Sequence, residues 1–110
     1  MVTATFSKDS ENMYHISFKG HAQYVTEGKD IVCTAVSTYA SVALKLLNEM
    51  HMEGIIGGLK YHNVPGDVEM EYFCWDDEPK NDNFLHFLTA GIEQIAEAYP
   101  DNVNLENRLA

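Results

Sequence analysis

The sequence predicts an α+β fold in which two helices pack on one face of a mixed, mostly antiparallel four-stranded sheet. Apolar residues alternate with polar ones in four short segments, which is typical of strands with one buried face. In two longer segments they recur at spacings of three and four, which is typical of helices that bury one side. The segments follow one another in ββα-ββα order, and this order favours helices on one side of a single sheet.

The first strand pair is expected in residues 2–7 and 14–19, on either side of the polar segment D-S-E-N. The second pair is expected in L-K-Y-H-N-V and D-V-E-M-E-Y-F-C-W, which are joined by P-G. In each pair the alternating apolar residues should face the core. These inward residues are Val2, Ala4, Phe6, Tyr14, Ile16, Phe18, Val68, Met70, Tyr72 and Cys74.

The first helix is expected from Ile31 to about Met50, with Asp30 as its N-cap and an end at the glycines of E-G-I-I-G-G. The last helix follows D-D-E-P-K-N-D-N and ends before Pro100. Residues 1–110 should form a single domain, with a loose tail from about residue 101. The apolar stripes of the two helices are Ile31, Ala35, Val36, Ala40, Ala43, Leu46 and Leu47 in the first, and Phe84, Leu85, Leu88, Ile92, Ile95 and Ala96 in the last.

The chain is strongly acidic, with seventeen acidic residues against seven basic ones and a formal charge of -10. This charge repels phosphate backbones, so we expect no nucleic-acid ligand and favour a basic partner. Solubility alone also explains such a charge.

Several features are typical of a cytoplasmic protein. The opening M-V-T-A-T-F-S lacks the basic and apolar blocks of a secretory signal. No apolar run approaches the roughly 20 residues that cross a bilayer, so we expect no membrane association. Without an export signal, Cys33 and Cys74 should be reduced thiols rather than a disulfide.

The segment from Gly20 to Ser37, G-H-A-Q-Y-V-T-E-G-K-D-I-V-C-T-A-V-S, contains a histidine and a cysteine that could act together. Asp30 as N-cap places Cys33 in the first helical turn, where the positive end of the helix dipole favours thiolate over thiol. The intervening loop could fold His21 back over the helix start as a general base and acid. From the residues alone, a catalytic pair, an ordinary buried thiol and a metal ligand are all open interpretations.

Three further positions in this segment are ambiguous. Asp30 could cap the helix, which is the interpretation that local geometry favours, or it could orient His21 through a hydrogen bond. Ser37, one turn beyond Cys33, could be a surface hydroxyl or could bond near the sulfur. Gly28 and the polar residues around it could let the loop open and close over a site.

No metal or phosphate site is predicted. The five histidines and two cysteines show none of the paired spacings of zinc ligands, so the metal interpretation is the weakest. The glycines of I-I-G-G-L lack the lysine and hydroxyl of a phosphate-binding loop. Trp75 and the tyrosines lack the interleaved basic residues of a nucleic-acid stacking surface.

The motif G-H-A, a short loop and then G-K-D-I-V-C-T-A-V-S resembles the signature of the ribosomal-processing cysteine protease family, Prp. The chain length and the ββα-ββα order are also similar. The family favours alanine after the cysteine, where this chain has Thr34. A threonine there should be tolerated, although it alters the edge of the site.

The resemblance implies a cytoplasmic, homodimeric endopeptidase that removes the N-terminal extension of large-subunit ribosomal protein twenty-seven and needs no cofactor. It implies Cys33 as nucleophile and His21 as general base, with Asp30 and Ser37 in support. Gly20 and the loop 22–29, which contains Gly28, would gate the substrate. A basic ribosomal substrate would also use the charge of -10.

Two rival classes stay open beside the protease. One is a non-catalytic acidic module that binds a ribosomal protein or an assembly intermediate. The other is a redox-sensing thiol protein, in which Cys33 would matter and His21 would not.

Overall fold

The computed structural model describes residues 1–21 and 31–109, which form five strands and two helices in the order ββαββαβ. The first six elements confirm the predicted order and class. The elements are β1 Val2–Lys8, β2 Met13–Lys19, α1 Ile31–Met52, β3 Gly57–Val64, β4 Asp67–Phe73, α2 Pro79–Ala98 and β5 Val103–Arg108.

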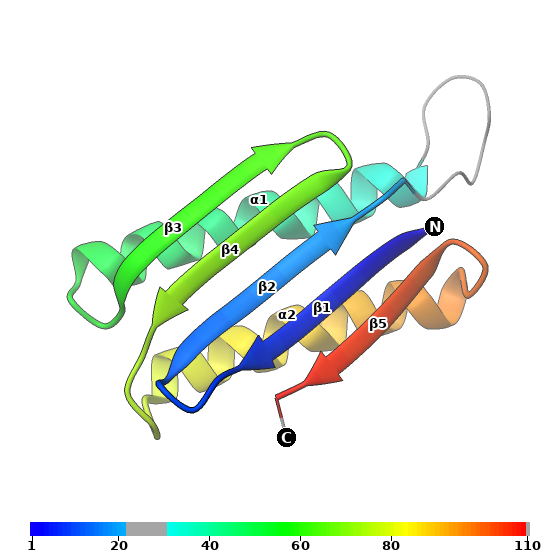
Figure 1. Cartoon of the computed structure of the whole chain (residues 1–110). Helices are drawn as coiled ribbons and strands as arrows, with labels where there is room; N and C mark the ends of the chain where they lie inside the picture. Colours follow the sequence, from blue (N-terminus) through cyan, green and yellow to red (C-terminus); the bar gives the residue numbers. More distant parts are fainter. Residues whose placement is uncertain (22–30, 110) are drawn as a thin grey trace.

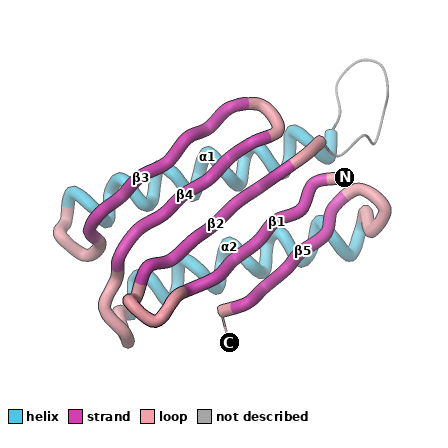
Figure 2. The backbone as a smooth tube through the Cα atoms, in the orientation of Figure 1, coloured by secondary structure: helices cyan, strands magenta, loops and turns pink. Residues whose placement is uncertain are grey.

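The strands form one mixed sheet in the order β3-β4-β2-β1-β5 (Figure 1). The pairs β1–β2, β2–β4 and β3–β4 are antiparallel, and β1–β5 is parallel. Both helices cover the same face of this sheet, as predicted, and leave the other face open (Figure 2). The last residue of β2, Lys19, lies opposite Asp67 at the start of β4. The end of β2 therefore lies beside the turn that joins β3 to β4.

The predicted loose tail from about residue 101 is wrong, because Val103–Arg108 form the edge strand β5. The sheet in the described residues therefore has five strands and not the four that were expected. Val103 lies opposite Val2, and Leu105 lies opposite Ala4, so both follow the inward register of β1. Val103 is buried and Leu105 is partly buried, while the residues between and after them are polar. A strand with so few apolar residues is stabilised by its pairing with β1, and that pairing joins the two ends of the chain.

The core lies between the sheet and the two helices. All ten inward-facing residues predicted in the strands are buried. In α1, however, the expected first core position is wrong: Ile31 is 55% exposed, and the buried side chain at the start of the helix is Val32. The helix also runs slightly past its expected end at Met50, to Met52.

Within the described ranges, α1 is long and apolar enough to cross a membrane by length and composition. No such segment was expected from the sequence. The core helix of a soluble protein passes the same test, and one side of α1 packs into the core described above.

A buried hydrogen bond joins the sheet to α2. The hydroxyl of Tyr72 on β4 donates to Oδ1 of Asn81, at a distance of 2.7 Å, and both side chains are almost fully buried. Burial raises the pKa of Tyr72 far above its ordinary value, so the hydroxyl stays protonated as a donor.

The Tyr72→Phe variant is expected to lose about 1–3 kcal/mol of unfolding free energy, because the amide oxygen of Asn81 would stay buried without its donor. Urea denaturation measures the difference. Tyr61→Phe, at a half-exposed tyrosine on β3, is the control and should match the parent. Equal stability of Tyr72→Phe and the parent would contradict this role of the hydrogen bond.

Candidate active site

Four segments meet at one end of the sheet and enclose a small cavity of about 190 Å³. They are the start of β1, the end of β2, the first two turns of α1 and the turn between β3 and β4. Both Cys33 and His21 line this cavity. Its full lining is Val2, Phe18, Gly20, His21, Cys33, Val36, Ser37, Pro65 and Gly66.

His21 directly follows β2, and the backbone before it is tightly constrained. The N–H of Gly20 donates to the carbonyl oxygen of Gly66 at 2.9 Å. Gly20 has a φ of +96°, and a Cβ at this position would lie 2.3 Å from the carbonyl oxygen of Met1. Only glycine fits both constraints. The backbone therefore leaves β2 at Gly20. The next residue, His21, is exposed and lines the cavity.

Cys33 lies in the first turn of α1 as the structure describes it, and its side chain is half-buried. Ser37, one turn further along α1, lines the same cavity. From Cys33 a shallow groove continues along the outer side of the helix. It is lined by Cys33, Thr34, Ser37, Thr38, Ser41 and Val42.

Two of the candidate positions, Asp30 and Gly28, lie outside the described residues, as does the rest of the proposed gating loop, 22–29. Their capping, orienting and gating roles stay predictions. Gly20 is described, and its place beside Met1 gives it a role at the end of β2, while a gating role is untested.

Sequence reasoning missed part of the cavity. Four of the lining residues come from three segments that are separate in the sequence: Val2, Phe18, Pro65 and Gly66. The pairing of β2 with β1 and with β4 brings these segments together at the end of the sheet where Cys33 lies. The P-G pair predicts a turn. Nothing local in the sequence indicates that this turn lies against His21.

Cys74 provides a contrast to Cys33. It is fully buried after β4, and its sulfur donates to the carbonyl oxygen of Ile55 at 3.7 Å. The pKa of this thiol is raised mainly by burial and, to a smaller extent, by the negative charges of Glu78 and Asp82. Cys74 is therefore a core thiol with little thiolate at neutral pH.

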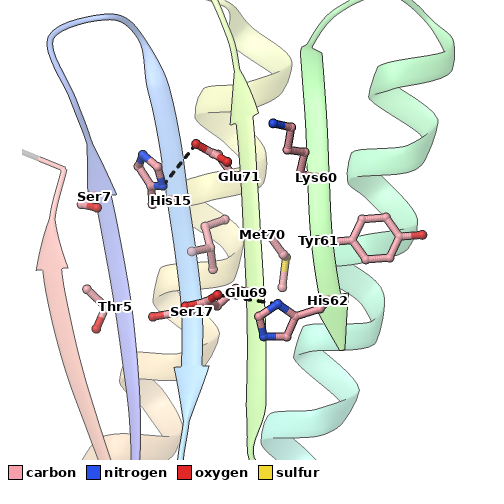
Figure 3. Close-up of a pocket in the computed structure, with 11 residues that line it drawn as sticks. Thr5, Ser7, His15, Ser17, Lys60, Tyr61, His62, Glu69, Met70 and Glu71 are labelled. Atoms are coloured by element: carbon pink, nitrogen blue, oxygen red, sulfur yellow. Dashed lines mark ion pairs between the residues drawn. The ribbon is translucent and has the colours of Figure 1, made fainter. Parts of the chain in front are cut away.

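A larger depression, of about 460 Å³, lies on the open face of the sheet and contains neither cysteine (Figure 3). Its histidines are engaged by carboxylates: His15 lies 4.0 Å from Glu71, and His62 lies 3.6 Å from Glu69. The rest of the lining consists of hydroxyl side chains of β1 and β2, Lys60 and Tyr61 of β3, and the apolar Ile16 and Met70. This face has ion pairs and hydroxyls, while the lining of the smaller cavity at the end of the sheet includes both a thiol and an imidazole, so we place the candidate active site in that cavity.

One group among the described residues has the donor set of a metal site. The ligand atoms of His62, Asp67 and Glu69 lie within 4.8 Å of one another. Sequence spacing did not indicate this cluster, because the turn between β3 and β4 brings its members together. The ammonium of Lys19, however, pairs with both carboxylates and already supplies positive charge there.

This ion-pair cluster predicts a specific acid sensitivity. The hydrogen bond from Lys19, and then the interaction with His62, lower the pKa of Asp67 below its ordinary 3.8. The ionised carboxylate of Asp67 therefore stabilises the folded protein at pH values above the unfolded-state pKa of this residue. That contribution to the unfolding free energy is lost as the pH falls through the folded-state pKa of Asp67. We expect Asp67→Asn to lose less stability than the parent between about pH 5 and about pH 2 in urea unfolding. Asp101→Asn, in the turn before β5, should follow the parent; parallel acid profiles for Asp67→Asn and the parent would contradict the assignment.

A comparison with models of known protein families shows which family this chain, with His21 and Cys33 lining one cavity, belongs to. The model described as Cysteine protease Prp matches residues 1–104. The chain belongs to the Prp family of cysteine proteases. The match spans almost the whole of the Prp fold described above, β1 to the start of β5, and includes both His21 and Cys33.

Solved structures share the Prp fold. An essential ribosomal processing protease Prp from S. aureus, in complex with a covalently linked product peptide, is 21% identical with a TM-score of 0.69, covering 98% of this chain and 100% of that chain. SMU.848 from Streptococcus mutans is 25% identical with a TM-score of 0.63, covering 100% of this chain and 96% of that one. No curated protein matches the chain.

Proposed function

We propose that this Prp-family chain is an endopeptidase with a Cys33–His21 dyad that removes the N-terminal extension of large-subunit ribosomal protein twenty-seven. The observation that carries the dyad is the shared cavity: Cys33 and His21 line one small space at the end of the sheet. The substrate class rests on the family match and on the similarity to the S. aureus ribosomal processing protease Prp.

The proposed chemistry uses only groups of this chain, with Ser37 on the same helical face and Asp30 in support. His21 takes the thiol proton, and the thiolate of Cys33 attacks the scissile carbonyl. The C–N bond breaks, the amine leaves with the proton from His21, and the extension stays bound as a thioester. Water, deprotonated by the same imidazole, hydrolyses the thioester and restores the thiol.

We propose that the enzyme is a cytoplasmic homodimer and that its substrate is basic. The chain has a formal charge of -10, and a protein that binds ribosomal RNA is strongly basic. Opposite charges speed encounter and make it salt-dependent. An extended peptide could lie in the groove that leads from Cys33 along α1.

The test is to incubate the protein with the extended form of that ribosomal protein and to measure intact masses. The proposal predicts one cut that releases the N-terminal extension. A substrate that binds but stays whole would instead support an acidic recognition module. If the protein neither cuts nor binds the substrate, and its properties change when Cys33 is oxidised, the result would support a redox-sensing thiol protein.

A further inference from the structure

The imidazole of His21 lies directly over Gly66 in the turn between β3 and β4. A Cβ added to Gly66 would lie 2.6 Å from Nε2, 2.8 Å from Cε1 and 3.3 Å from Cδ2 of His21. A carbon atom essentially never approaches a side chain so closely. The ring therefore occupies the space that any other residue at position 66 would fill.

Gly66 also fixes the backbone that leads into His21. Its carbonyl oxygen accepts the N–H of Gly20 at 2.9 Å, one residue before the histidine. The residues on either side of this bond, Lys19 and Asp67, lie opposite each other in the β2–β4 register and form an ion pair. The turn is thus attached to the end of β2 by a hydrogen bond and by an ion pair.

We infer that Gly66 is a positioning residue for the general base: its bare backbone is the surface on which the His21 imidazole rests in the cavity that it shares with Cys33. This inference rests on the proposed dyad and adds to it a residue that does no chemistry. A side chain at position 66 would push the ring out of the cavity. A displacement of about 1 Å can lower a rate about 100-fold, because proton transfer needs the two groups within hydrogen-bond reach.

The chain offers a matched control in Gly54. Gly54 and Gly66 have nearly the same φ, +76° and +78°, so the positive φ disfavours alanine at both positions. A Cβ at Gly54 would meet nothing within 4 Å, whereas one at Gly66 meets the imidazole. Comparing Gly66→Ala with Gly54→Ala therefore separates the collision with His21 from backbone strain.

The experiment measures the rate at which iodoacetamide alkylates Cys33 as a function of pH, in a Cys74→Ala background, together with thermal unfolding and the cleavage rate. We expect Gly66→Ala to show the pH profile of His21→Ala and about 100-fold slower cleavage. Gly54→Ala should keep the parent's profile and rate. Because His21 is exposed and can rotate away, both glycine variants should fold and unfold at similar temperatures.

Three results would overturn the inference. If His21→Ala changes the profile but Gly66→Ala does not, the dyad stands and the positioning role is wrong. If His21→Ala leaves both the profile and the cleavage rate unchanged, the dyad fails and the positioning role fails with it. If Gly66→Ala unfolds where Gly54→Ala does not, Gly66 serves the hairpin rather than the imidazole.

Discussion

Replacing Cys33 by alanine is expected to abolish cleavage of the extended ribosomal protein, with a loss in rate on the order of 10⁶-fold, as for removal of a nucleophile from other hydrolases. Without the sulfur no thioester can form, and water would have to attack the peptide bond directly. The half-buried side chain lines a cavity as well as packing against the core, so alanine there should cost less stability than at a fully buried position. The measurement is the intact mass of the substrate after extended incubation.

Cys74→Ala is the matched control for this variant. It removes the chain's other thiol, which is buried and lies away from the cavity. It should lose some stability, because it leaves a small void in the core, but it should keep the cut. A Cys33→Ala protein that still releases the extension at the parent's rate would contradict the assignment of Cys33 as nucleophile.

Replacing His21 by alanine is expected to slow cleavage by about 10²–10⁴-fold, the usual contribution of a general base and acid. The alkylation rate of Cys33 at neutral pH should fall as well, because the base that takes its proton would be lost. Since His21 is exposed, the unfolding temperature should stay close to that of the parent. Steady-state cleavage and alkylation rates on the same preparation test both statements.

His51→Ala is the control for His21→Ala, because His51 is exposed at the far end of the same helix as Cys33. It should cleave and alkylate as the parent does. If cleavage is lost in Cys33→Ala but unaffected in His21→Ala, another group serves as the base, and the dyad is wrong while the nucleophile is right.

Local patterns in the sequence were sufficient for most of the fold. The alternation of Val2, Ala4 and Phe6 and the helical spacing of Val36, Ala40 and Ala43 come from neighbouring residues that share a face, so the sequence shows them directly. Cys33 near the start of α1 follows from the same helical pattern.

Long-range pairing was harder to predict. The strand β5 has only two apolar residues, Val103 and Leu105, and its partner β1 lies at the other end of the chain, so local pattern alone predicts a tail there. Similarly, Gly66 lies under His21 only because β2 pairs with β4 in a register that puts Lys19 opposite Asp67. Neither contact has a local sequence pattern.

The proposed mechanism requires the sulfur of Cys33 to attack the scissile carbonyl of the substrate directly. The most direct measurement is to mix the parent protein with the extended ribosomal protein, quench in acid before turnover is complete, and map adducts by peptide mass spectrometry. We expect a thioester of the N-terminal extension on the peptide that contains Cys33. Cleavage with no adduct on Cys33, and unchanged in Cys33→Ala, would contradict it.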